Sequence, residues 1–86
     1  MYKKTVTVTN QVGLFAKPAT YFIRKANEFK SSIRIEKDNH NVNAKSLLSV
    51  LSLSIQNGDD MVLVAEGIDE EAAVNELAEL INTNLD

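Results

Sequence analysis

Two segments of the chain carry residues whose types and spacing could do chemistry. The first, residues 13–19, reads GLFAKPA: a glycine turn leads into a helix start, with Lys17 beside the first N–H groups. Unpaired N–H donors and the helix dipole both favour negative charge at such an end. Such an end can attract an anion, but the pattern by itself favours an ordinary helix start with an exposed lysine. Phe15, in the same turn, has no proton to exchange and cannot hold a phosphoryl group.

The second segment is a short leucine-rich helix headed by a serine. Residues 45–53 read KSLLSVLSL, which predicts Ser46 as the N-cap, preceded by Lys45. An unmodified N-cap hydroxyl accepts a backbone N–H bond that contributes roughly 1 kcal/mol. A phosphate on the same oxygen would carry about −1.5 to −2 charges and offer new acceptor atoms to a partner's Arg or Lys. Ser46 is therefore both a predicted helix cap and a candidate phosphoacceptor.

The same helix has more leucine than a single core contact needs. On a helical wheel one side holds Leu47, Val50 and Leu51, whereas Leu48 and Leu53 point away from it. Some of these side chains should then be exposed, and an exposed apolar cluster on a small protein marks an interface. The alternative is that the small fold buries all of them.

Size and charge limit what these segments can serve. With 86 residues, 44% of them apolar, we expect one domain over residues 1–86 with little room for an enclosed active site. The formal charge of −3 argues against direct binding to nucleic acid or to an anionic membrane. The absence of cysteine removes thiol catalysis and thiolate metal sites and fits a cytoplasmic location. We expect no cofactor, no metal and no membrane span.

The one histidine is the remaining candidate nucleophile. His40 stands between Asn39 and Asn41, and residues 38–40 have the composition of a hairpin turn. We interpret His40 as a turn residue. The acidic side chains of the last third of the chain are explained by a solvated helix face.

Hydrophobic periodicity predicts four strands that position these residues. Residues 5–9 alternate with period two, which puts Val6 and Val8 on one face. Residues 33–36 and 41–43 predict a hairpin, and the apolar run at residues 61–65 predicts an interior strand.

Helical spacing accounts for the rest of the chain. A first helix is predicted from Ala16 towards Phe29, with Pro18 tolerated in its first turn. Asp69 is predicted to cap a last helix, whose buried side holds Val74, Leu77, Leu80 or Ile81, and Leu85. The order βαββαβα predicts an α+β fold. We expect an open-faced two-layer sandwich in which a four-stranded, mainly antiparallel sheet carries three helices on one face.

Assembled in this way, the chain resembles the HPr family over its whole length. That family comprises the small phosphocarriers of the bacterial sugar phosphotransferase system. GLFAKPA at residues 13–19 is similar to the family's Gly-Ile/Leu-His-Ala-Arg-Pro-Ala, and NAKSLL at residues 43–48 is similar to its regulatory serine segment. Phe15 replaces the phospho-accepting histidine, and Lys17 replaces an arginine that helps to hold the phosphate. A phenyl ring cannot form a phosphoramidate, so the resemblance implies no phosphohistidine relay at this position.

In keeping the serine without the histidine, the chain is similar to the branch called catabolite repression HPr. There an ATP-dependent HPr kinase/phosphorylase modifies the serine, and the phosphoserine form binds a LacI-type transcriptional regulator as corepressor. The resemblance implies that this chain is a non-enzymatic regulator phosphorylated on Ser46. The partner-binding residues that it implies are Phe15, Lys17, Lys45, Leu47, Leu48 and Leu51.

Two other hypotheses stay open. One is an unmodified or repurposed HPr-like interaction domain that binds through Phe15 and the leucines alone. The other is a sugar phosphotransferase system phosphocarrier that uses His40 or another nucleophile. Ser49 and Ser54 stand where family members often have glycine, so their side chains could crowd a docked partner.

Overall fold

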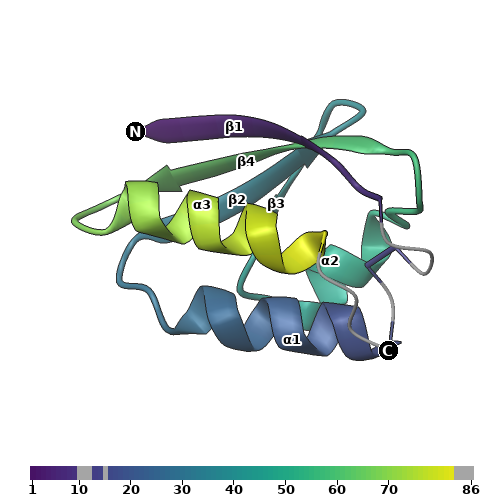
Figure 1. Ribbon diagram of the computed structural model, residues 1–86, viewed down its shortest axis with the longest axis horizontal. Coiled ribbons are helices and arrows are strands. Elements are labelled where there is room, and N and C mark those ends of the chain that lie inside the picture. The colour runs from purple at the N-terminus through teal and green to yellow at the C-terminus, as the bar shows by residue number, and fades with distance from the viewer. Residues whose placement is uncertain (10–12, 15, 83–86) are drawn as a thin grey trace.

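The computed structural model describes residues 1–9, 13–14 and 16–82. Within these residues the elements follow the predicted order βαββαβα (Figure 1). The strands are β1 (Tyr2–Thr7), β2 (Ser32–Lys37), β3 (His40–Asn43) and β4 (Asp60–Glu66), and the helices are α1 (Ala16–Asn27), α2 (Leu47–Ser52) and α3 (Glu70–Ile81). No helix in this part of the chain is long and apolar enough to span a membrane.

The described strands form one sheet in the order β1-β4-β2-β3, and every neighbouring pair is antiparallel. β4 lies between β1 and β2, so its apolar run is that of an interior strand, as predicted. Figure 1 shows the helices gathered over one face of the sheet, with α1 and α3 side by side. The predicted open-faced two-layer architecture is confirmed.

The core fills the space between the sheet and the helices. Side chains alternate across each strand, so Ile33 and Ile35 of β2 and Leu63 of β4 point inward together. Phe22 of α1 and Leu77 of α3 close the core from the helical layer, and both are fully buried. The helices are thereby held at fixed positions above the sheet.

The first strand differs in its limits from the one predicted over residues 5–9. β1 starts at Tyr2, because pairing with β4 extends it: Tyr2 lies opposite Ala65. It ends at Thr7, although Val8 is still buried and its N–H donates to the Asp59 carbonyl. The predicted inward face, Val6 and Val8, is correct, and the limits were wrong because the partner strand sets them.

His40 is not a turn residue. It is the first residue of β3 and lies opposite Lys37 of β2. The hairpin turn consists of Asp38 and Asn39, whose φ angles are 49° and 69°. Two successive positive φ angles match the twist of the flanking strands in a two-residue hairpin, and Asp and Asn tolerate them best after glycine.

Candidate functional site

Ser46 is the N-cap of α2, as predicted. Its backbone is extended (φ −107°, ψ 115°), and its Oγ accepts the N–H of Ser49 at 3.4 Å. That distance is at the long end for a hydrogen bond, so the hydroxyl is held weakly. The residue is only partly buried. The Ser46 hydroxyl thus stands at the head of the helix with one long bond to the backbone of α2.

Lys45 uses its polar groups within the protein. Its Nζ donates to the Phe29 carbonyl at 2.8 Å, and its backbone N–H donates to Asn43 Oδ1 at 2.9 Å. Asn27, the last residue of α1, donates in turn from Nδ2 to the Lys45 carbonyl at 3.3 Å. These bonds attach the start of α2 to the end of α1, so the Lys45 ammonium is a fixed charge and not a freely moving one.

The leucines of α2 divide between core and surface. Leu48 is 81% exposed and Leu47 is 41% exposed; we call these two residues the α2 patch. Leu51 is partly buried, and Val50 is fully buried. The prediction that some leucines are exposed is confirmed. Leu53 was wrongly placed away from the core: the helix ends at Ser52, and the chain turns Leu53 inward as the C-cap.

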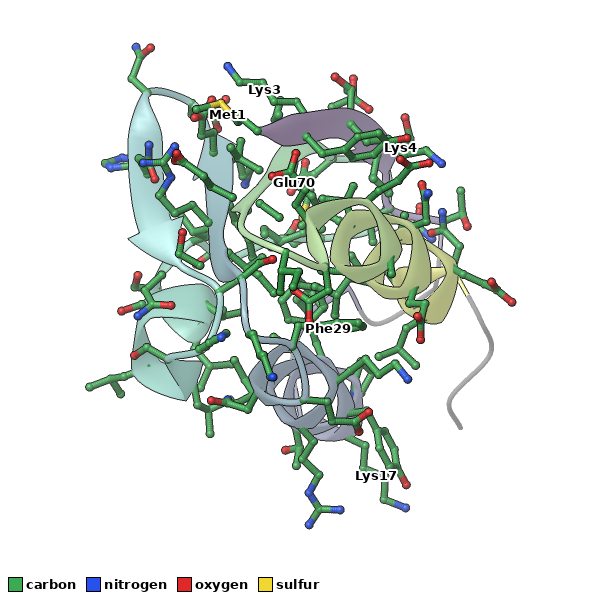
Figure 2. The ribbon with its side chains drawn as sticks, turned by 90° about the vertical axis from the view of Figure 1, so that its left-hand side faces the viewer. Met1, Lys3, Lys4, Lys17, Phe29 and Glu70 are labelled. Carbon is green, nitrogen blue, oxygen red and sulfur yellow. The ribbon has the colours of Figure 1, made fainter. Side chains whose placement is uncertain are left out.

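The glycine turn at residues 13–14 lies against the segment that follows α2. The Leu14 N–H donates to the Ile55 carbonyl at 3.0 Å, and Gly13 has a φ of 72°. Lys17, in the first turn of α1, is exposed, and Figure 2 shows it projecting from the helix on the far side of the molecule from Lys3 and Lys4. Phe15 lies outside the described residues.

Two contacts show how α2 lies relative to α1. The end of α1 contacts Lys45 before α2, whereas the turn before α1 contacts Ile55 after α2. Asn27 is ten positions after Lys17, about 15 Å along the axis of α1. The start of α2 therefore contacts the end of α1 that is remote from Lys17. Among the described residues, no hydrogen bond or ion pair joins Lys17 to Ser46.

The C-terminal end of α2 is held by a lysine that the sequence analysis missed. Lys37 donates from Nζ to the Leu53 carbonyl at 3.3 Å and pairs with Asp59 at 3.1 Å. The Asp59 carboxylate also accepts the Gln56 N–H, and this bond, together with Lys37, lowers the pKa of Asp59. Ser54 follows the helix with a φ of 51°, the left-handed conformation for which glycine is preferred.

Asp69 precedes α3 as predicted, but its side chain does not cap that helix. It accepts the backbone N–H groups of Lys30 and Ser31, each at 2.9 Å, and the Ser31 hydroxyl. The Ser31 hydroxyl bond, followed by the Lys30 N–H, lowers the pKa of Asp69 to about 2. The Asp69 carboxylate thus joins the start of α3 to the connection between α1 and β2. No local sequence pattern predicts this contact.

These bonds predict an acid-dependent loss of stability. The folded-state pKa of Asp69 is about 2 against an ordinary 3.8, so the unfolded chain takes up a proton at higher pH than the folded one. The stabilisation from Asp69 is complete above pH 3.8 and is lost as the pH falls towards 2. Asp69→Asn should therefore unfold at lower urea concentration than the wild type at pH 6, and the difference should disappear near pH 2.

Glu71→Gln is the matched control, since it removes the same charge from an exposed position in the first turn of α3. Urea denaturation followed by circular dichroism at several pH values measures both variants. A difference between wild type and Asp69→Asn that stays constant from pH 6 to pH 2 would contradict the assignment.

Fold and site together define a class of small α+β proteins. In this chain the helices cover one face of an antiparallel sheet, and a serine caps the short helix α2. Residues 2–83 match the family model described as the PTS HPr component phosphorylation site. The chain belongs to the HPr family.

The relatives include both kinds of HPr protein. The HPr-like protein Crh of Bacillus subtilis is 41% identical over 78 residues, covering 91% of this chain and 92% of Crh. The phosphocarrier protein HPr of Borreliella burgdorferi is 42% identical over 83 residues, covering 96% of each chain. The crystal structure of HPr-C-His from Thermoanaerobacter tengcongensis aligns with a TM-score of 0.92 at 44% identity, over 94% of this chain and 91% of that one. Relatives named Crh and relatives named phosphocarrier protein HPr are thus about equally identical to this chain.

Proposed function

We propose that this protein is a non-enzymatic cytoplasmic regulator that is phosphorylated on Ser46 by an HPr kinase/phosphorylase. In its phosphorylated form it binds a LacI-type transcriptional regulator as corepressor. The observation that carries the proposal is a partly exposed N-cap serine, Ser46, directly followed by the exposed α2 patch. Phe15 supports it, because the position of the family's phosphohistidine holds no nucleophile.

Phosphorylation of Ser46 would change the surface without disturbing the fold. The hydroxyl gives up only one long bond to Ser49, and a phosphate at the same place meets the positive end of the α2 dipole. The new charge would stand beside Leu47 and Leu48, so charge and apolar contact would be offered to the partner together. An Arg of the partner could bind the phosphate while its apolar side chains cover the leucines.

Lys17 has a separate part in this proposal. It is exposed in the first turn of α1 and makes no contact with Ser46 among the described hydrogen bonds and ion pairs, so it would contact the partner directly and not the phosphate. Lys45 would act by holding α2 against α1 through the Phe29 carbonyl. The partner surface would then extend from the α2 patch towards the first turn of α1.

Incubation of the purified protein with an HPr kinase/phosphorylase and ATP tests the proposal. The wild type should gain one phosphate group, detected by intact-protein mass spectrometry. The absence of any uptake would contradict it and leave the unmodified interaction domain as the better explanation. Acid-labile phosphate gained from phosphoenolpyruvate and enzyme I would instead identify a phosphocarrier.

Leu48→Ala should weaken binding to the LacI-type regulator much more than it lowers the melting temperature. Leu48 is 81% exposed, so its truncation costs the fold little, whereas an apolar anchor at an interface is worth at least about 1 kcal/mol, or roughly five- to tenfold in affinity. Isothermal titration of the phosphorylated variants measures the affinity, and thermal denaturation measures the stability.

Ile68→Ala provides the matched control. Ile68 is 89% exposed and lies in the connection between β4 and α3, so its truncation removes a similar apolar side chain away from α2. Its affinity should remain that of the wild type. Equal losses of affinity in both variants, or a larger loss of stability in Leu48→Ala, would contradict a docking role for the α2 patch.

A further inference from the structure

A hollow of about 480 Å³ lies where edge strand β3 ends and the chain leaves the sheet towards α2. β2 is two residues longer than β3 and continues past it towards Ser32, so β3 does not cover that end of β2. The walls come from the connection between α1 and β2, from β2 and β3, and from the approach to α2. Ser46 does not line this hollow.

The lining of the hollow is cationic. Lys30, Arg34 and Lys45 contribute to it, and none of its lining residues is Asp or Glu. Three other hollows on the described surface each include at least one carboxylate, such as Glu79, Glu36 or Glu76. The chain has a net charge of −3, so a hollow lined by cations and by no carboxylate differs from the average surface of this protein.

Two of the three cations have no partner within the described residues. Neither the Lys30 ammonium nor the Arg34 guanidinium makes an ion pair or side-chain hydrogen bond there, and both residues are exposed. The Lys45 ammonium is fixed by its 2.8 Å bond to the Phe29 carbonyl. The charges are therefore present at the hollow and not neutralised inside it.

The carboxylates closest in the sequence and in the sheet do not enter the hollow. Asp69 approaches it from α3, but its oxygens already accept two backbone N–H groups and the Ser31 hydroxyl. Glu36 and Glu66 stand on the same outward face of the sheet as Arg34, and neither is part of the lining. Glu36 accepts the Asn41 side-chain amide at 3.4 Å, so this carboxylate lies at the edge of the hollow and already has a partner there.

We propose that this hollow binds a small phosphate-bearing ligand, independently of any modification at Ser46. The Arg34 guanidinium can bind two phosphate oxygens at once, and Lys30 adds a point charge. The Asn43 side-chain amide adds a neutral donor at the rim, whereas Ser32 and Asn41 already donate to the Glu66 carbonyl and to Glu36. A volume of about 480 Å³ fits a small molecule.

Titration of the ¹⁵N-labelled protein with inorganic phosphate, and separately with glycerol 3-phosphate, tests this proposal. Sodium chloride at equal ionic strength serves as the reference. We expect saturable amide shifts centred on residues 30–34 and 41–45. Equal affinity for the two probes would assign the hollow to the free anion, and tighter binding of the ester would assign it to a phosphorylated metabolite; both outcomes support the proposal.

Arg34→Gln should weaken the binding about tenfold, since it removes a charge-assisted bidentate contact. Lys3→Gln is the matched control, because Lys3 is an exposed strand lysine on β1 and is not part of the lining (Figure 2). Shifts that follow sodium chloride equally, that centre on residues 13–19, or that persist unchanged in Arg34→Gln would overturn the proposal. Well-dispersed spectra of both variants establish that they are folded.

Discussion

Ser46→Ala is expected to abolish phosphate uptake from ATP in the presence of an HPr kinase/phosphorylase, while the fold remains intact. Alanine has no oxygen to accept the phosphoryl group. The cost to the fold is small, because the lost N-cap bond to Ser49 is 3.4 Å long and such caps contribute roughly 1 kcal/mol. Intact-protein mass spectrometry measures the uptake, and circular dichroism shows whether the helices are retained.

Ser52→Ala is the matched control for this experiment. Ser52 is an exposed serine of the same helix, and its hydroxyl donates to the Ser49 carbonyl at 2.6 Å. This variant should take up one phosphate as the wild type does. Uptake that survives in Ser46→Ala, or is lost in Ser52→Ala, would place the modified oxygen elsewhere and end the assignment to Ser46.

Gly13→Ala should destabilise the protein by roughly 2–5 kcal/mol. Its φ of 72° is unfavourable for a residue with a Cβ atom, and that Cβ would meet the backbone of Ile55 and Gln56 directly. Backbone atoms cannot rotate away as a side chain can, so the turn before α1 and the segment after α2 would have to separate. Urea denaturation measures the change.

Gly58→Ala separates the two causes of this loss. Gly58 also has a positive φ, 94°, but a Cβ there would meet nothing within 4 Å. It should therefore cost only the conformational part, roughly 1–2 kcal/mol. Equal destabilisation of the two variants would mean that the contact between residues 13–14 and Ile55 is not the constraint.

The elements could be predicted because their signals are local. Alternation of Val6 and Val8, the apolar run of β4 and the helical spacing around Phe22 each lie within one short stretch of chain. The limits of β1 and the position of His40 could not be predicted, because strand pairing with β4 and β2 sets them. Pairing depends on residues far away in the sequence.

The candidate site, like the fold, could be predicted where its signals are local. The N-cap at Ser46 and the surplus leucines of α2 follow from residue type and spacing over a few positions. The resemblance to the HPr family rested on the two segments around residues 13–19 and 43–48, and the match to the family model agrees with it. The Lys37 contact with the end of α2 and the Asp69 contact with Ser31 join residues 16 and 38 positions apart, so no local pattern could show them.

By itself the amino-acid sequence determined which chemistry is available: a phenyl ring at position 15, a hydroxyl at position 46 and no thiol. Residue identity decides this, whatever the fold. Only the tertiary structure decided where those groups lie. It joined the start of α2 to the end of α1, and it gathered Lys30, Arg34 and Lys45 from separate segments around one hollow. The physical reason is burial of the common core. The helices pack against the inward face of the sheet, and this packing fixes the positions of the side chains that they carry.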